Sequence, residues 1–500
     1  MLSGPMTSSA SRHHRETSGR PVVLTWQIWL PWLAFASILL TATRTDPDLW
    51  GHVRFGLDWL RTLTLPSIDP YSFTQDTAWV NHEWLSEASM GGAFALLGSA
   101  GLVLLKTIVV AGAVVVVWRR LAGSTPIVRA AVTTLGIVAA LPVTVTVRPQ
   151  IWSLLGLVLL VPLLQEPAPT PRRCLASTAL FCLWANLHGG WITGGAALAS
   201  HIGVRIVRAP RDAARWLALG VASLAATLIN PYGTGLWEFL ATTVRSSRPD
   251  ITEWAPFSLH EPPIMWVSVV APLASLAWVL RRAGTRPPVE ASAVVILLVL
   301  AGLRVSRVAP LVCPACLALL GPWIAKACGQ VGAIRAPNRA AAGVLLLPAV
   351  LSILAAREPV SNALSCIAIS DVWAPDRAAA ASLVSVSGRL WTTFDWGEYA
   401  IWHFGPLLRV SIDGRRETVY SIAVIDWHRA IERGDPAAVG RLIGVGPEYV
   451  WLPAARHEVR AALVEHGYRV DVQTSDSFVA VRQDVARLPT GKTPLPQCFP

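Results

Sequence analysis

The feature that most constrains this chain is a series of long apolar stretches that carry almost no charge. One run extends from about Val22 to Ala42, and others begin near Gly101, Ile127, Ile151, Cys174, Trp191, Ala214, Ile264, Ala291, Val308 and Ala341. About 20 apolar residues suffice for a helix to cross a bilayer. The chain is 53% hydrophobic and 15% charged, whereas soluble proteins carry about 25% charged residues. We therefore predict an all-α polytopic membrane bundle of about 11 transmembrane helices, and exclude a soluble enzyme, a fibrous protein and a disordered chain.

The distribution of basic residues predicts the orientation. A cytoplasmic N-terminus places on the inner side Arg119, Arg120, Arg129, Arg172, Arg173, Arg205, Arg208, Arg211, Arg215, Arg281, Arg282, Arg286, Lys326, Arg335 and Arg339. The outer loops hold far fewer, as positive-inside sorting requires. The net charge of +11 does not indicate nucleic-acid binding, because the basic residues lie between apolar runs and form no single face. We expect a multi-pass plasma-membrane protein in the lipid bilayer.

Composition also predicts the domains. Residues 1–21 form a cytoplasmic tail, and residues 22–357 form the membrane domain with a large outer loop at 43–86. An odd number of spans leaves residues 358–487 outside, where short β-rich runs alternate with helical ones and predict an extracytoplasmic α/β domain. Its expected strands are Leu390–Phe394, Leu408–Ile412, Tyr449–Leu452, Tyr468–Val472 and Phe478–Val481, and its expected helices are Ile422–Glu432 and Glu458–Glu465. The Pro- and Thr-rich tail, residues 488–500, is predicted to be loose.

On this topology, acids, histidines and arginines from separated segments gather at the outer membrane surface. The candidates are Asp46, Asp48, His52, His82, Glu83, Arg148, His188, Glu253, Arg304 and Arg307. Ionisable groups near spans are costly unless they face a polar cavity, so their convergence predicts a functional site.

The residue types suggest a chemistry. Asp46 and Asp48, separated by the rigid Pro47, could bind one divalent cation such as Mg or Mn, or divide into a base and a stabilising group. Nearby arginines and imidazoles can hold a phosphate whose charge grows as it leaves. A carboxylate base, a leaving phosphate and a membrane together suit group transfer from a lipid-phosphate donor.

The D-P-D motif at Asp46–Asp48, after the first span and in a long outer loop, resembles the acidic motif of the GT-C membrane glycosyltransferases. The run from D-P-D-L-W-G-H to N-H-E-W-L-S-E is also similar to uncharacterised bacterial polytopic proteins, in which R-P-Q, W-A-N-L-H-G-G, N-P-Y-G, E-W and I-D-G-R recur in this order. The first resemblance covers only the first span and loop, and the second covers most of the chain. The chain lacks the W-W-D-Y-G signature of oligosaccharyltransferases, which disfavours N-glycosylation of proteins.

The superfamily resemblance implies an inverting transferase that takes a sugar from a polyprenyl-phosphate or -diphosphate donor at the outer face. Asp46, or in second place Asp48, would then be the base or a metal ligand, and the acceptor would belong to the cell envelope. The binding roles of the other eight candidates rest on the predicted topology. An alternative is a transporter or flippase for an anionic lipid-linked precursor; a weaker one is a non-catalytic scaffold.

Each signal also has a purely structural interpretation. T-D-P-D is good N-cap sequence, so Asp46 and Asp48 could cap a helix. His52, His82 and Glu83 could be interfacial anchors, His188 could serve a helix contact made by glycines, and the arginines could reach the headgroups. I-D-G-R at Ile412–Arg415 is most simply a turn. Cys366 and Cys498 would both lie outside, where a disulfide between them is compatible with the compartment.

Overall fold

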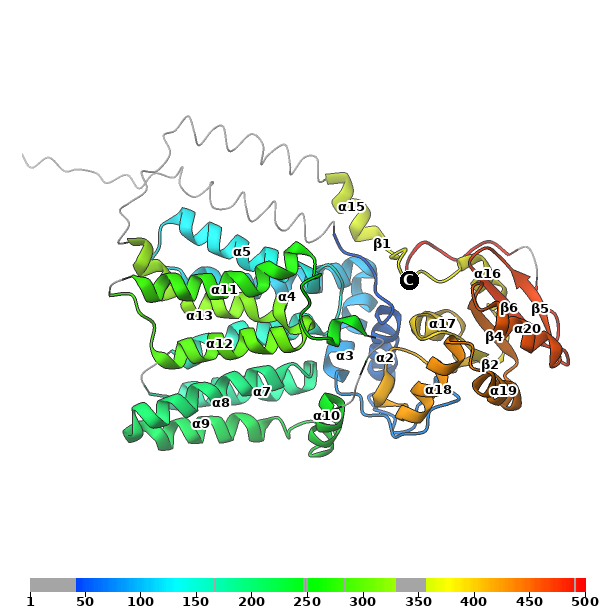
Figure 1. Cartoon of the computed structure of the whole chain (residues 1–500), viewed down its shortest axis with the longest axis horizontal. Coiled ribbons are helices and arrows are strands. Elements are labelled where there is room, and N and C mark those ends of the chain that lie inside the picture. Colours follow the sequence, from blue (N-terminus) through cyan, green and yellow to red (C-terminus); the bar gives the residue numbers. More distant parts are fainter. Residues whose placement is uncertain are drawn as a thin grey trace, which may run out of the picture.

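The computed structural model describes residues 42–165, 168–245, 248, 251–282, 284–329, 357–489 and 492–500. It has two parts: a helical bundle and a smaller domain of strands and helices at one end of it (Figure 1). The helices α2 (Leu49–Thr62) and α3 (Trp84–Leu97) lie between the two parts. The bundle and the α/β C-terminal domain predicted from the sequence are therefore both present.

Each apolar run predicted within the described residues forms a helix. These are α4 (Ser99–Arg120), α5 (Pro126–Thr144), α6 (Gln150–Leu164), α7 (Pro171–Leu187), α8 (Trp191–Arg208), α9 (Ala213–Ala226), α11 (Pro263–Arg281), α12 (Val289–Arg304) and α13 (Ala309–Gly329). The shorter α10 (Gly235–Arg245) follows α9. Among the described residues, four helical segments are long and apolar enough to cross a membrane: Ser99–Arg120, Ile127–Thr144, Pro263–Arg281 and Ser306–Gly329.

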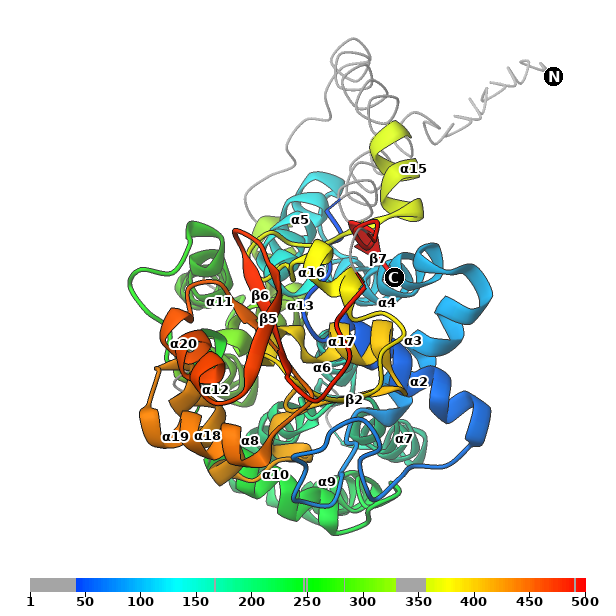
Figure 2. The same ribbon diagram turned by 90° about the vertical axis from the view of Figure 1, so that its right-hand side faces the viewer.

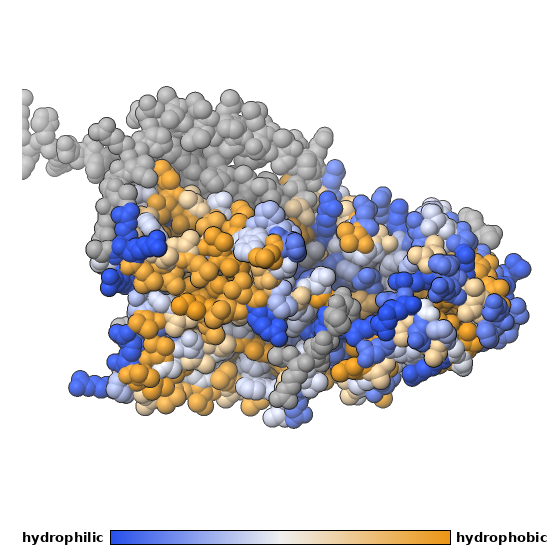
Figure 3. Space-filling view, viewed as in Figure 1, coloured by the Kyte–Doolittle hydropathy of each residue, from blue (hydrophilic) through white to orange (hydrophobic). Residues whose placement is uncertain are grey.

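The count of 11 spans stays a prediction, because the remaining bundle helices are shorter or less apolar. The first predicted run, of which only Ala42 is described, and the last one, from Ala341, lie outside the described residues, as does the tail at 1–21. Apolar side chains cover the flank of the bundle, whereas hydrophilic ones gather at its free end and over the C-terminal domain (Figure 3). This distribution is that of a membrane protein.

Glycines bring the bundle helices close around Trp184 of α7. A Cβ on Gly156 of α6 would lie 2.6 Å from the Trp184 ring, and one on Gly194 of α8 would lie 2.5 Å from it. These two glycines lie outside the W-A-N-L-H-G-G motif, but a Cβ on the motif's own Gly190 would lie 2.1 Å from Ser153 Oγ of α6, a close contact of the kind that the motif's glycines suggested. Trp184 Nε1 also donates a hydrogen bond to Ser153 Oγ at 2.8 Å. The packing of Trp184 therefore also positions the Ser153 hydroxyl, which belongs to the site described below.

The C-terminal domain contains a mixed five-stranded sheet of order β3-β2-β4-β6-β5. Its strands are β2 (Gly388–Trp391), β3 (Leu408–Val410), β4 (Tyr449–Pro453), β5 (Tyr468–Gln473) and β6 (Ser477–Arg482). Strand β2 pairs in parallel with β3 and β4, whereas β6 pairs antiparallel with β4 and β5. All five predicted strands are confirmed; the first ends at Trp391 because Phe394–Trp396 forms a 3-10 turn.

Helices surround this sheet: α16 (Arg377–Ser382), α17 (Gly397–Phe404), α18 (Ile422–Glu432), α19 (Pro436–Val445) and α20 (His457–Glu465). The predicted helices correspond to α18 and α20. Helix α17 packs on α2, and the two lie side by side in both views (Figures 1 and 2). Trp50 of α2 contacts Tyr399 of α17 at a ring separation of 5.4 Å. The loop at residues 43–86 and the C-terminal domain thus share one hydrophobic core.

The C-terminal tail does not have the loose structure that its composition predicted. After α15 (Arg357–Ser365), strand β1 (Ile367–Ala368) pairs antiparallel with β7 (Cys498–Phe499). A disulfide joins Cys366 to Cys498, and Phe499 is buried. Proline-rich composition disfavours regular structure, but a covalent link and one buried aromatic ring hold these last residues in place.

Candidate functional site

Asp46 is buried at the start of the loop at residues 43–86, and each of its two carboxylate oxygens accepts a hydrogen bond. Its Oδ1 accepts the backbone N–H of Asp48 at 2.9 Å, and its Oδ2 accepts a hydrogen bond from Arg148 Nε. Asp48 precedes α2, but its side chain makes no capping hydrogen bond. The capping interpretation therefore does not apply to Asp48, and Asp46 closes a local turn while it binds an arginine from a distant segment.

Asp48 is the freer of the two carboxylates, with 29% of its side chain exposed. Arg148 Nη2 lies 3.8 Å from its Oδ2. Burial raises the pKa of Asp48, and the negative charge of Asp46 adds to this effect against the opposing charge of Arg148. A carboxylate with a raised pKa and one loosely held oxygen is suited to accept a proton.

Glu398 of α17 is a site residue that the sequence reasoning missed. Its side chain is buried, and its Oε2 accepts the N–H of Gly51 at 3.0 Å. A Cβ on Gly414 would lie 2.2 Å from Asp48 Oδ1 and 2.8 Å from Glu398 Oε1, so the two carboxylates meet at this glycine. Burial raises the pKa of Glu398 well above its ordinary value, and the charges of Asp48 and Asp413 raise it further.

A line of ion pairs extends from the aspartates to a cavity. Arg148 Nη1 lies 3.2 Å from Glu253 Oε1, and Arg307 Nε lies 3.5 Å from Glu253 Oε2. Glu253 is in the turn η2 (Thr252–Trp254), and Arg307 is in η3 (Ser306–Val308), just before α13. Burial would raise the pKa of Glu253, but the charges of Arg307 and Arg148 outweigh it and lower the pKa.

These three side chains line a cavity of about 260 Å³ at the ends of α5, α6, α11 and α13. Pro142, Val143, Met265 and Pro310 form apolar parts of its wall. Asp46 and Asp48 do not line it directly; Arg148 stands between them and the cavity. The polar wall carries Arg148 and Arg307 together with Glu253 and Glu261. The two arginines can bind an anionic head group, and the apolar part of the wall can hold a hydrocarbon chain.

A second cluster contains Glu83, His82 and His188. The Nε2 atoms of both histidines lie 3.5 Å from Glu83 Oε1. His188 Nδ1 is within hydrogen-bond distance of Ser153 Oγ at 2.6 Å and accepts the N–H of Gly190 at 3.0 Å. Because Nδ1 is an acceptor, a neutral His188 carries its proton on Nε2, which faces Glu83. Burial lowers the pKa of His188 to about 4, so the ring is neutral at pH 7.

His52 lies on α2 and pairs with α3. Its Nδ1 is 3.2 Å from Glu87 Oε1, and Glu87 Oε2 also accepts a hydrogen bond from Asn81. Burial lowers the pKa of His52, but the hydrogen bond and charge of Glu87 outweigh it and raise the pKa to about 9. His52 is therefore charged at pH 7 and joins the two helices of the first outer segment.

Arg304 is the one predicted site residue that the structure leaves apart. It is exposed in the last turn of α12, and no contact with the other candidates is observed for it within the described part of the chain. Of the other nine candidates, five lie along the line of ion pairs, three form the cluster around Glu83, and His52 pairs with Glu87. Topology alone could not separate Arg304 from Arg307, because both follow the same apolar run; only the 3-10 turn at Ser306–Val308 directs Arg307 inward.

The I-D-G-R sequence is more than the turn that it was predicted to be. Arg415 binds Asp69 of the first loop through Nη1 at 2.7 Å and Nη2 at 2.8 Å, and it binds Asp413 through Nε and Nη2. Tyr420 also donates to Asp413 at 2.7 Å. This buried network joins the first outer loop to the C-terminal domain and places Gly414 against Asp48. The I-D-G-R pattern indicates a local turn, but it cannot indicate that Arg415 binds Asp69, which lies 346 residues away in the sequence.

The two aspartates do not fit the divalent cation that the D-P-D motif was expected to bind. Both Asp46 oxygens already accept hydrogen bonds, and the guanidinium of Arg148 lies where a cation would bridge Asp46 and Asp48. No group of three or more His, Cys, Asp or Glu side chains in the described residues is arranged to hold a metal. Arg148 supplies the positive charge here.

Comparisons with known proteins agree with this architecture. Neither the protein-family models nor the curated proteins give a match. Among solved structures, the chain is similar to ArnT from Cupriavidus metallidurans bound to undecaprenyl phosphate, with a TM-score of 0.51 and 13% identity over 91% of this chain and 98% of that one. At this identity the likeness shows that the chain shares the overall fold of ArnT.

Proposed function

We propose that this protein is a membrane glycosyltransferase that moves a sugar from a polyprenyl-phosphate-linked donor to a cell-envelope acceptor at the outer face. The observation that carries the proposal is the ionic chain Asp46–Arg148–Glu253–Arg307, which joins a carboxylate pair to a cavity whose wall contains apolar side chains and two arginines. The similar fold of ArnT, a structure bound to undecaprenyl phosphate, supports the donor class. The acceptor is inferred from the expected location alone.

The residues divide the chemistry between them. The acceptor oxygen attacks the anomeric carbon as the bond from that carbon to the phosphate oxygen breaks, and the bonding electrons stay on the phosphate. Arg148 and Arg307 bind that phosphate as its charge grows. Asp48 takes the proton of the acceptor hydroxyl. Asp46, whose oxygens are both engaged, orients Arg148, so we place the base at Asp48 rather than Asp46.

The location at the outer face has separate support. The disulfide between Cys366 and Cys498 is typical of an oxidising compartment. The C-terminal domain that contains Cys366 also carries Glu398 to the carboxylate pair, so the site and the disulfide belong to the same side of the bundle. Both features agree with the orientation predicted from the basic residues.

The test is sugar transfer in membranes from a panel of labelled polyprenyl-phosphate sugars. We expect Asp48→Asn to abolish turnover while donor binding persists, and Asp46→Asn to weaken both because it releases Arg148. Asp426→Asn is the matched control, since Asp426 is an exposed carboxylate of α18 that pairs with nearby Arg429. Transfer that survives both first-loop substitutions would refute this site.

The alternative of a lipid-precursor transporter is tested in the same preparation. Sealed vesicles report whether the labelled lipid changes leaflet without loss of its sugar. Leaflet exchange with no transfer from any donor of the panel would replace the enzyme proposal by the transporter. Transfer with release of free polyprenyl phosphate would support the enzyme.

A further inference from the structure

The segment that leads into Asp46 is held on both sides by backbone pairing. Arg44 N donates to Val145 O at 2.9 Å, and Arg44 forms a bridge with Thr146, two residues before Arg148. On its other side, Thr45 N donates to Ala368 O at 3.0 Å. The immediate support of Asp46 therefore comes from the connection between α5 and α6 and from β1.

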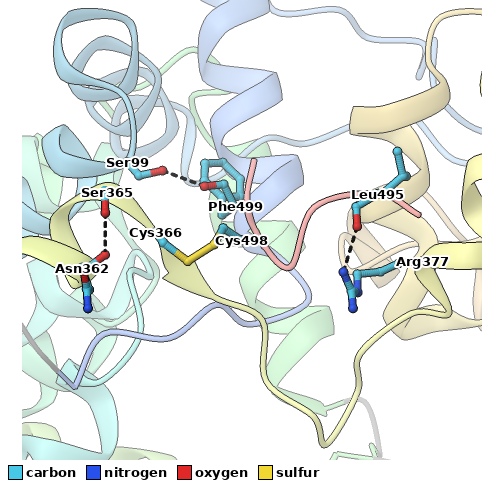
Figure 4. Close-up of a disulfide and its surroundings, with 8 residues drawn as sticks. All are labelled: Ser99, Asn362, Ser365, Cys366, Arg377, Leu495, Cys498 and Phe499. Carbon is cyan, nitrogen blue, oxygen red and sulfur yellow. Dashed lines mark hydrogen bonds between the residues drawn. A yellow bond between two sulfur atoms is a disulfide. The ribbon is translucent and has the colours of Figure 1, made fainter. Parts of the chain in front are cut away.

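Strand β1 is in turn fixed by the last residues of the chain. Ala368 pairs with Cys498, Ile367 pairs with Phe499, and the disulfide between Cys366 and Cys498 closes the pair covalently. Figure 4 shows this disulfide beside Ser99, whose hydroxyl donates to Phe499 O at 2.8 Å. We call residues 366–368 and 498–499, with their disulfide, the C-terminal clamp.

The clamp also touches α2 directly. The Phe499 ring lies 5.2 Å from Trp50, 5.5 Å from Phe94 of α3 and 5.5 Å from Trp402 of α17. Phe499 and Trp50 are both fully buried. Trp50 is two residues beyond Asp48, so the clamp holds the chain on both sides of the carboxylates: at Thr45 through β1 and at Trp50 through Phe499.

We propose that the disulfide-closed C-terminal clamp positions Asp46 and Asp48 for catalysis. Its members are positioning residues, because they act through the backbone of residues 44–50. No contact of the clamp with Glu253 or Arg307 is observed in the described part of the chain, so its loss acts on the placement of Asp46 and Asp48 and, through Asp46, on Arg148. This inference rests on the proposed function for its kinetic consequence, but its structural part does not.

The test uses the full-length protein in detergent, with the double variant Cys366→Ala/Cys498→Ala. The matched control is Cys174→Ala/Cys182→Ala, which removes two free cysteines of α7. Hydrogen exchange is measured for peptides that cover residues 43–52 and, as an internal reference, for peptides of α18 and α19. We expect faster exchange in residues 43–52 of the clamp variant only, with the reference peptides unchanged.

The kinetic readout is the donor-dependent rate. Small misplacements of a catalytic group cost up to about a hundredfold in rate, so we expect kcat of the clamp variant to fall by about tenfold to a hundredfold. KM for the donor should rise as well, because Asp46 orients Arg148. If the variant fails to fold, the native protein is reduced with a water-soluble phosphine and then reoxidised. Lost and regained turnover, with matching exchange at 43–52, supports the clamp in the same way.

The outcomes separate the two proposals. Unchanged exchange at residues 43–52 after loss of the disulfide would overturn the clamp, and so would faster exchange throughout the domain, since the disulfide would then serve only general stability. Local exchange without any sugar transfer by the wild type would support the clamp as a positioning element and refute the proposed reaction.

Discussion

Replacing Arg415 by Met should destabilise the junction between the first loop and the C-terminal domain by about 3–5 kcal/mol. Met keeps the buried stem but removes the guanidinium that binds Asp69 and Asp413 through four hydrogen bonds of 2.7–2.8 Å. Both carboxylates are buried. Removing one partner of a buried ion pair leaves an uncompensated charge, which costs about 3–5 kcal/mol.

An independent estimate gives the same size and adds a pH dependence. Burial would raise the pKa of Asp413, but the charge and hydrogen bonds of Arg415 lower it below its ordinary value. Without Arg415, the buried Asp413 becomes neutral by binding a proton. Protonating an aspartate costs about 1.4 kcal/mol for each pH unit above its ordinary pKa near 3.9, so the cost at pH 7 is about 4 kcal/mol. At pH 5 the cost falls to about 1.5 kcal/mol.

The assay is equilibrium denaturation of the detergent-solubilised protein at pH 5 and pH 7, followed by tryptophan fluorescence. Arg415→Met/Asp413→Asn should regain part of the loss, because it removes one stranded charge. Arg61→Met is the control, since Arg61 forms an exposed pair with Asp58 and should cost less than about 1 kcal/mol. A loss below about 1 kcal/mol for Arg415→Met, or an equal loss at both pH values, would refute the reasoning.

Three further predictions concern the carboxylates and the histidine of the site. The raised pKa of His52, about 9 against an ordinary 6.5, stabilises the fold below pH 6.5. Denaturation should therefore show a lower free energy of unfolding for His52→Gln than for wild type below pH 6.5, and this difference should be lost as the pH rises through 9. Glu398, whose pKa is raised by burial and by Asp48, costs stability as the pH rises, so Glu398→Gln should gain in melting temperature over wild type toward alkaline pH, whereas exposed Glu465→Gln should not. Gly414→Ala forces a Cβ to 2.2 Å from Asp48 Oδ1, so transfer should fall at least about tenfold while resistance to proteolysis is kept; wild-type turnover would contradict this.

The local sequence was sufficient for most of the secondary structure. Apolar runs give helices, and the alternating runs in the C-terminal region give all five strands of the sheet. Helix α18 has the predicted bounds because Ser421, just before it, accepts the Val424 N–H as an N-cap. These signals are read within a few residues, since the side-chain periods of helices and strands are short. Short helices such as α17 gave no such signal, because eight residues contain too few turns for a period to show.

The candidate site was predictable only in part, and for a related reason. The membrane topology placed Asp46, Asp48, Arg148 and Glu253 on one surface, because it needs only the order of the spans and the sign of the loops. It could not reveal which arginine binds which acid. The contact between Asp46 and Arg148 depends on pairing of residues 44 and 146, which no local pattern encodes.

The sequence by itself determined that the chain is an apolar helical bundle with a C-terminal α/β domain, and it predicted a gathering of acids, histidines and arginines on one side. Only the tertiary structure decided that Glu398 meets Asp48, that Arg415 joins Asp69 to Asp413, and that the proline-rich tail returns to hold β1. Burial and charge pairing between residues hundreds of positions apart depend on the packed fold, and they decide which of many polar residues can share a site.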